Sequence, residues 1–146
     1  MTPAIPIGNA MTVRVVSVSP DDSVQLVVQR MMEEEIGAVV VCEGPRLVGI
    51  FTERDVLRLA SEGPDFLTVR VDTVMTTQVV TVSPDVSVID AARLMGERRV
   101  RHLPVVEGEN VLGLVGIRDV LSVLGEWAWR EHDDDARETS RELLGR

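Results

Sequence analysis

Two copies of one motif follow each other in this chain of 146 residues, and this duplication constrains the fold more than any other feature. When Met11 is aligned with Met75, 64 positions later, the copies run without a gap to Leu57 and Leu121. The identical pairs include Thr12/Thr76, Val15/Val79, Val16/Val80, Val18/Val82, Ser19/Ser83, Pro20/Pro84, Ser23/Ser87, Val24/Val88, Met31/Met95, Gly49/Gly113, Arg54/Arg118 and Asp55/Asp119. Repeats of this length usually mean that one unit cannot bury its apolar face alone, so we expect the copies to pack together.

Each copy predicts the element order β-α-β-β-α. A β-rich run, at 14–18 or 78–82, ends at Ser-Pro, which stops a strand. A capped helix follows, with apolar residues at i, i+3, i+4 and i+7: Val24, Val27, Val28 and Met31, then Val88, Ala91, Ala92 and Met95. The hairpin that comes next has strands at 38–42 and 47–51, or at 103–106 and 111–115, and these are apolar enough to be covered on both faces. A second helix begins near residue 53 or 118.

The sequence therefore predicts an α/β (α+β) fold in which two tandem motifs pack as a pseudo-twofold pair. We place an N-terminal segment at 1–10, the first motif at 11–61, a connection at 62–74, the second motif at 75–124 and a charged, acidic helical tail at 125–146. Trp127 and Trp129 lie in this tail, two positions apart, so on a helix they point about 200° apart. One of them can face the core, while the other is exposed or covered by a second chain.

The charge of the chain excludes some partners. Its net charge is -9 and its pI is near 4.7, so nucleic acid and anionic membrane surfaces are poor partners. The N-terminus does not resemble a secretory signal, and no apolar stretch approaches the roughly 20 residues that span a bilayer. We expect a soluble, cytoplasmic protein. Its one cysteine, Cys42, lies in an apolar run and is interpreted as a small buried hydrophobic residue.

The junction between the hairpin and the second helix of each copy is the candidate site. A helix N-terminus exposes free backbone N–H groups that suit a phosphate. Beside it, Thr52 offers a hydroxyl, Arg54 a cation that can hold phosphate, and Asp55 a carboxylate that can hold a ribose diol. The second copy keeps the Arg and the Asp but has Gly116 in place of the hydroxyl. An alternative stays open, because Thr-x-x-Asp is also typical of a capping box.

These motifs, in order and duplicated over residues 10–124, resemble a CBS domain pair, also called a Bateman module. The resemblance rests on the Ser-Pro after the first strand, the capped helix, the segment from Gly49 to Asp55, and the segment from Arg101 to Val106. Members of that family bind AMP, ADP, ATP or S-adenosylmethionine in clefts between the two copies. The resemblance implies the same here, with no required cofactor.

The resemblance also implies particular roles for residues. Asp55 and Asp119 would hold the ribose, and Arg54, Arg118, Arg101 and His102 would reach the phosphates. The adenine would meet the backbone at Ser17, Val18, Thr81 and Val82, and at Gly37, Ala38, Arg101 and His102. Because Thr52 has no counterpart in the second copy, we expect the cleft at Asp55 to be the better formed one.

The sequence favours a binding module over an enzyme. It shows no nucleophile elbow, P-loop or paired carboxylates, so we assign no catalytic residue. Only two histidines are present, His102 and His132, with no paired cysteines, so we expect no metal site. The leading hypothesis is a regulatory module that forms a homodimer and binds an adenine nucleotide. Binding would change the contacts within the dimer or with a regulated protein. The alternative is a ligand-free dimerisation or adaptor module in which the acids only cap helices.

Overall fold

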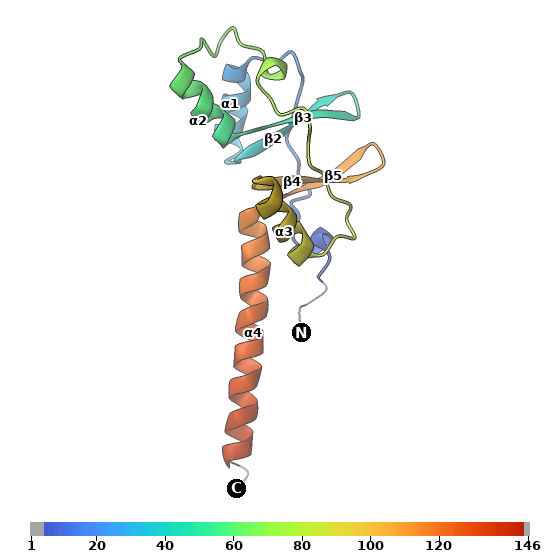
Figure 1. Cartoon of the computed structure of the whole chain (residues 1–146), viewed down its shortest axis with the longest axis vertical. Coiled ribbons are helices and arrows are strands. Elements are labelled where there is room, and N and C mark those ends of the chain that lie inside the picture. The colour runs from blue at the N-terminus through green and yellow to red at the C-terminus, as the bar shows by residue number, and fades with distance from the viewer. Residues whose placement is uncertain (1–4, 145–146) are drawn as a thin grey trace.

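Two similar halves meet at their strands, and one long helix leaves them (Figure 1). In this computed structural model the backbone is described for residues 5–144 and the side chains for residues 5–132. The elements are η1 (Ile7–Asn9), β1 (Ser17–Val18), α1 (Val24–Glu33), β2 (Ala38–Glu43), β3 (Arg46–Thr52), α2 (Glu53–Glu62), η2 (Val71–Thr73), α3 (Val88–Arg98), β4 (His102–Glu107), β5 (Asn110–Gly116) and α4 (Ile117–Leu144). The predicted mixed fold of two tandem motifs and a C-terminal helix is confirmed.

The first helix of each copy forms where the sequence predicted it. Ser23 and Ser87 precede α1 and α3, and each serine oxygen accepts an N–H from three residues later, at 3.1 Å in both cases. Such caps satisfy one of the free donors at a helix start. The apolar face of each helix then enters the core: Val24, Val27 and Met31 are buried on α1, and Val88, Ala91 and Met95 on α3.

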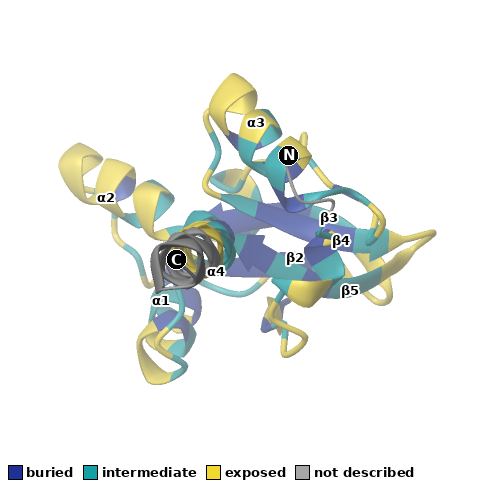
Figure 2. Ribbon diagram, turned by 90° about the horizontal axis from the view of Figure 1, so that it is seen from below, coloured by how far each residue is buried: buried dark blue, intermediate teal, exposed yellow. Residues whose placement is uncertain are grey.

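The strands form a hairpin in each half, and the middle of each hairpin is largely buried (Figure 2). In the first half, β2 pairs with β3 in antiparallel register and with the short β1 in parallel register. In the second half, β4 pairs with β5 in the same antiparallel way. Gly44 and Gly108 turn the two hairpins with φ angles of 60° and 61°, a left-handed conformation that glycine adopts without cost.

The first strand of each copy is shorter than our prediction. In the first copy, only Ser17–Val18 of the predicted 14–18 form β1. Within the described backbone, residues 78–82 form no strand, and Val82 makes only an isolated parallel bridge to Val105. The reason is Pro104. In the first half the N–H of Val40 donates to the carbonyl oxygen of Val16 at 3.2 Å. Pro104 occupies the position equivalent to Val40 and has no N–H to donate, so one bond of the parallel ladder is lost.

The two copies exchange their N-terminal segments. Ile7 precedes the first copy, but it is fully buried in the core of the second half, and its N–H donates to the carbonyl of Val86 at 2.6 Å. The equivalent Val71 is fully buried in the core of the first half, where its N–H donates to the carbonyl of Asp22 at 2.9 Å. Each core is therefore completed by a segment that the repeat assigns to the other copy.

Two equivalent pairs of backbone hydrogen bonds fix the segments that cross between the halves. Thr12 and Leu114 exchange N–H···O bonds of 2.8 and 3.0 Å, and Thr76 and Ile50 exchange two bonds of 3.0 Å each. These crossings hold the segments that follow η1 and η2 against β5 and β3. The space between the two halves is lined by these segments and by the starts of α2 and α4.

Helix α4 is continuous from Ile117 to Leu144 and runs through residue 125, where the sequence placed the start of a tail. Its first turns pack on α3, and the rest extends away from both halves (Figure 1). Trp127 is half-buried, whereas the side chain of Trp129 is 77% exposed. The acidic side chains at 133–135 lie outside the described residues, as do residues 1–4 of the expected N-terminal segment. Among the described residues, no helix is long and apolar enough to cross a membrane.

Candidate functional site

Two cavities lie between the halves, and the repeat relates one to the other. We call them the Asp55 cleft and the Asp119 cleft, and their volumes are about 510 and 570 Å³. The Asp55 cleft is lined by Ile50, Thr52, Glu53, Arg54, Asp55, Leu57, Thr76, Gln78, Val79, Val80, Arg99, Val100, Arg101 and His102. The Asp119 cleft is lined by Thr12, Arg14, Val15, Val16, Met31, Met32, Glu35, Ile36, Gly37, Ala38, Glu53, Arg101, His102, Leu114, Gly116, Ile117, Arg118 and Asp119. Both volumes lie within the range of small-molecule sites in proteins.

In the Asp55 cleft, the start of α2 holds its acid in place. The Oδ2 atom of Asp55 accepts the backbone N–H of Thr52 at 2.9 Å and the hydroxyl of Thr52 at 3.3 Å. Its Oδ1 atom lies 3.5 Å from Nη2 of Arg58. The side chain of Asp55 keeps 16% exposure, so it remains in contact with the cleft. Asp55 thus caps the helix, as the alternative interpretation predicted, and one oxygen still has acceptor capacity for a ligand.

In the Asp119 cleft, the acid keeps the same geometry without the hydroxyl. The Oδ2 atom of Asp119 accepts the backbone N–H of Gly116 at 2.9 Å. The ring of His102 lies beside position 116: a Cβ there would be in ordinary van der Waals contact, 3.5 Å from Cδ2 of His102 and 3.4 Å from Oδ2 of Asp119.

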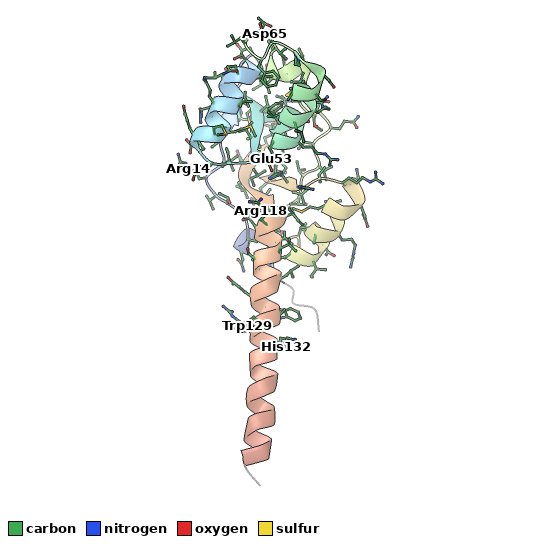
Figure 3. The ribbon with its side chains drawn as sticks, turned by 90° about the vertical axis from the view of Figure 1, so that its left-hand side faces the viewer. Arg14, Glu53, Asp65, Arg118, Trp129 and His132 are labelled. Atoms are coloured by element: carbon green, nitrogen blue, oxygen red, sulfur yellow. The ribbon has the colours of Figure 1, made fainter. Side chains whose placement is uncertain are left out.

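The two clefts share a wall made by the side chains of Glu53, Arg101 and His102, which line both. Glu53 begins α2, and it lines the Asp119 cleft together with Arg118 at the start of α4 (both labelled in Figure 3). A Cβ added at Gly37 would lie 3.2 Å from the carboxyl carbon of Glu53, so that glycine admits the carboxylate. The pKa of His102 lies below its ordinary value because burial disfavours its charged form; Glu53 and Asp119 oppose this effect, and Arg101 adds to it.

The structure brings nine of the predicted binding residues to the clefts. Thr52, Arg54 and Asp55 line the first cleft, Gly37, Ala38, Arg118 and Asp119 the second, and Arg101 and His102 both. The other four, Ser17, Val18, Thr81 and Val82, line neither cleft.

The residues two or three positions earlier line the clefts instead: Val15 and Val16 in one, Val79 and Val80 in the other. The reason is geometric. Val18 and Val82 are buried in the two cores, and Ser17 and Val18 pair with β2. The stretch of backbone that lines a cleft therefore lies N-terminal to Ser17 in the first copy and to Thr81 in the second.

The sequence argument missed Glu53, Gln78 and Arg99 in the Asp55 cleft and Arg14 and Glu35 in the Asp119 cleft. Two of them are related by the repeat. Glu35 and Arg99 occupy equivalent positions just after α1 and α3, and both have a left-handed backbone, with φ angles of 54° and 55°. Charged residues in such a turn project next to the strand that follows, but nothing in a linear pattern indicates that the turn borders a cavity.

The remaining candidate residues lie elsewhere. Among the side chains described for residues 5–132, no group of three His, Cys, Asp or Glu residues is placed to hold a metal ion. His132 lies exposed on α4, beyond the halves (Figure 3). Cys42 is half-buried at the end of β2 rather than fully buried, and its partial burial raises the pKa of the thiol.

Known proteins resemble this chain over both copies. The family model for the CBS domain matches residues 7–62 and again residues 71–126. The CBS domain-containing protein YhcV of Bacillus subtilis is 36% identical over 115 residues, which cover 78% of this chain and 81% of that protein. The crystal structure of the CBS domain protein NE2398 superposes with a TM-score of 0.78 at 35% identity, covering 82% of this chain and 98% of that one.

A more distant structure carries ligands. The CBS domain pair of protein MJ0100 was crystallised in complex with 5'-methylthioadenosine and S-adenosyl-L-methionine. It superposes with a TM-score of 0.78 over 85% of this chain and 98% of that one, at 21% identity. At that identity the likeness concerns the fold.

Proposed function

This chain belongs to the CBS domain family, and from that membership we propose that its CBS pair is a regulatory module that binds an adenosine-containing ligand in the clefts between its two copies. The ligands considered are AMP, ADP, ATP and S-adenosylmethionine. The observation that carries the proposal is the pair of clefts themselves. Each combines a helix N-terminus, an aspartate at that helix start and an arginine next to it.

Each of these groups suits one part of such a ligand. The free oxygen of Asp55 or Asp119 can accept hydrogen bonds from the two ribose hydroxyls. The exposed N–H groups at the start of α2 or α4, with Arg54 or Arg118, favour an anionic group. Apolar side chains such as Val80 in one cleft and Ile36 in the other provide the surface on which a purine can pack.

Calorimetric titration with AMP, ADP, ATP and S-adenosylmethionine tests the proposal. We expect at least one of these to bind, and we expect Asp55→Ala combined with Asp119→Ala to abolish that binding. Since both substitutions also remove helix caps, Ser23→Ala is the matched control: it removes the cap of α1 but lines neither cleft. Absence of heat from all four compounds, or binding that survives the double substitution, would contradict the proposal.

We also propose that the module acts as a homodimer whose contacts respond to the ligand. Leu57 on α2 and Leu121 on α4 are equivalent in the repeat, and their exposed fractions are 73% and 60%. Trp129 is a further exposed apolar side chain on α4, at 77%. Large exposed apolar side chains are typical of interfaces. A ligand that binds between the halves can bias their arrangement, and so the dimer or a regulated partner, if it prefers one arrangement.

Sedimentation of Leu121→Arg tests the dimer. We expect the wild-type protein to sediment as a dimer and this variant as a monomer. Leu67→Arg is the control, because Leu67 is 70% exposed but belongs to the connection between the copies and to neither α2 nor α4. A wild-type monomer, or a dimer that tolerates Leu121→Arg, would contradict this part of the proposal.

The adaptor alternative keeps one observation in its favour. Asp55 and Asp119 both accept backbone N–H groups at helix starts, and this accounts for the acids without a ligand. An adaptor would dimerise and give no heat with any of the four compounds, so the same two experiments distinguish the alternatives.

A further inference from the structure

The two clefts differ most in the charges that the repeat places at equivalent positions. The Asp55 cleft is lined by three arginines (Arg54, Arg99, Arg101) and two carboxylates (Glu53, Asp55). The Asp119 cleft is lined by three arginines (Arg14, Arg101, Arg118) and three carboxylates (Glu35, Glu53, Asp119). Since Glu53 and Arg101 belong to both linings, the difference arises from the residues that each cleft has alone.

The exchange of Arg99 for Glu35 is the largest of these differences. These residues are equivalent in the repeat, and their φ angles of 55° and 54° give them the same left-handed turn after α3 and α1. Both are exposed, and each lines its own cleft. The backbone thus presents a cation at the mouth of one cleft and an anion at the same place in the other.

The two clefts also differ in how many of their arginines form ion pairs. Nη2 of Arg14, in the Asp119 cleft, lies 2.9 Å from Oε2 of Glu34, so its charge is partly neutralised. Within residues 5–132, none of the ion pairs of the structure involves Arg54, Arg99, Arg101 or Arg118. The Asp55 cleft therefore has three arginines outside ion pairs and the Asp119 cleft has two, and guanidinium groups bind phosphate oxygens well.

We propose that the clefts select different ligands: the Asp55 cleft takes an adenine nucleotide with a charged phosphate chain, and the Asp119 cleft takes an adenosine compound without phosphate. The inference rests on the proposed function, because it assumes that both clefts bind adenosine. It adds that the residue pair at positions 99 and 35 selects the ligand. Phosphates near Glu35 meet a like charge, while phosphates near Arg99 meet an opposite one.

Charge-reversal variants test this selection. ATP and adenosine are titrated into the wild-type protein, Arg99→Glu, Glu35→Arg and the double variant, which keeps the net charge of the chain unchanged. We expect Arg99→Glu to weaken ATP binding about tenfold, a moderate effect because the site is exposed and the charges are screened. Adenosine binding, which we place in the other cleft, should be unchanged. Glu35→Arg is expected to add a second equivalent of ATP. The double variant should move the ATP preference to the other cleft.

Methionine methyl groups identify the cleft that is occupied. Met31 and Met32 line the Asp119 cleft, and no methionine lines the Asp55 cleft. In protein with 13C-labelled methionine methyl groups, adenosine should therefore shift the Met31 and Met32 signals of the wild type. ATP should shift them only in the variants that carry Glu35→Arg.

The controls are Arg98→Glu and Glu33→Arg, which make the same charge changes nearby at exposed residues that line neither cleft. They should leave the ratio of ATP to adenosine affinity unchanged. If both compounds fill both clefts with equal preference, or if the control variants act like the test variants, the selection is refuted while nucleotide binding stands. If neither compound binds, the proposed function and this inference fail together.

Discussion

Asp55 and Asp119 each accept a backbone N–H from three residues earlier, so each carboxylate stabilises its helix whether or not a ligand is bound. This has a consequence for any binding study, because a substitution at either residue changes stability and site at once. A ligand can use only the acceptor capacity that the cap leaves free. At Asp55 that is mainly Oδ1, which the guanidinium of Arg58 approaches at a long distance of 3.5 Å.

We predict that Asp55→Ala lowers the free energy of unfolding of the ligand-free protein by about 1–2 kcal/mol, because the N–H of Thr52 loses its partner in a part-buried place. Thr52→Ala should cost less, below about 1 kcal/mol, since the backbone N–H at position 52 still reaches the carboxylate. Urea denaturation measures both. A larger loss for Thr52→Ala than for Asp55→Ala would show that the hydroxyl, and not the carboxylate, forms the cap.

The pH dependence of the free energy of unfolding should reveal the lowered pKa of His102. Its pKa in the folded chain lies below the ordinary value of 6.5 because of burial. Between these two values the unfolded chain binds the extra proton, so the free energy of unfolding falls as the pH falls below about 6.5. From pH 7.5 to 5.5 we expect His102→Asn to lose less stability than the wild type, by at most about 1.4 kcal/mol. Urea denaturation at both pH values measures the difference.

His132→Asn is the control for this comparison, because His132 is exposed on α4 and far from the shared wall (Figure 3). It should follow the wild type at both pH values. The prediction for His102 is wrong if its substitution leaves the pH dependence unchanged. Glu53, Asp119 and Arg101, which face His102, are retained in both variants.

Sequence reasoning located the residues whose chemistry is local and missed those that tertiary structure brings in. Asp55 and Asp119 were found because a strand-helix junction with an acid is visible in a linear pattern. Arg99 and Glu53 were missed as cleft residues because their position depends on how the halves meet. Ser17 and Val18 were predicted to meet the adenine, but β1 pairs with β2 at these residues, and the open backbone edge comes before them.

At the scale of elements, the repeat predicted the four α-helices and both hairpins, but it overestimated the first strand of both copies and did not predict the short helices η1 and η2. The periodic apolar positions of α1 and α3 fix which face is buried, and the Ser caps fix where each helix begins. The failure at residues 78–82 came from assuming that the copies behave alike. One proline on the neighbouring strand, Pro104, removes a donor that the first copy uses. A comparison of the copies at position 40 and position 104 would have predicted the loss.

Two equivalent glycines on the hairpins should respond differently to the same substitution. A Cβ at Gly113 would lie 2.9 Å from the backbone oxygen of Thr12 and 2.7 Å from Sδ of Met11, so the crossing between Thr12 and β5 must shift. At Gly49 the atoms in the way all belong to the flexible side chain of Met75. We predict that Gly113→Ala lowers the free energy of unfolding by about 1–3 kcal/mol and that Gly49→Ala costs clearly less.

Thermal or urea denaturation of the two variants measures this difference. Gly96→Ala is a suitable control for the substitution itself, because no atom lies within 4 Å of the added Cβ on α3. That variant should be neutral or slightly more stable, since alanine favours a helix over glycine. Equal losses at Gly49 and Gly113 would mean that the backbone crossings are as adaptable as a methionine side chain.

At the scale of the whole molecule, the exchanged segments show that the structural halves do not coincide with the sequence copies. All the residues that form the core of the first half, from Val16 to Met75, lie within one stretch of chain. That stretch is not the first sequence copy at 11–61, because it continues through the connection to Val71 and the residues packed around it. Ile7, which lies just before the first copy, belongs to the core of the second half. The structural half is displaced toward the C-terminus relative to the repeat, and the alignment of the copies alone does not reveal this displacement.

This displacement predicts which half-length fragment holds structure. Residues 14–76 contain the whole first core, and in particular the bonds from the N–H groups of Val24 and Gln25 to the carbonyls of Val69 and Phe66, at 2.9 and 3.0 Å. Residues 1–62 contain the first repeat in full but lack these partners and the fully buried Val71. Both fragments are near the size at which a core becomes marginal, so each missing contact matters.

We therefore expect the fragment 14–76 to keep more helical circular dichroism and a steeper urea transition than the fragment 1–62, although the two are nearly equal in length. Val71→Ala in the fragment 14–76 is the control, because it removes only the exchanged side chain. Since Val71 is fully buried, this substitution should lower the free energy of unfolding of the fragment by about 2–3 kcal/mol. If the fragment 1–62 is the more structured of the two, the exchanged segments do not complete the cores, and the repeat and the folding unit coincide after all.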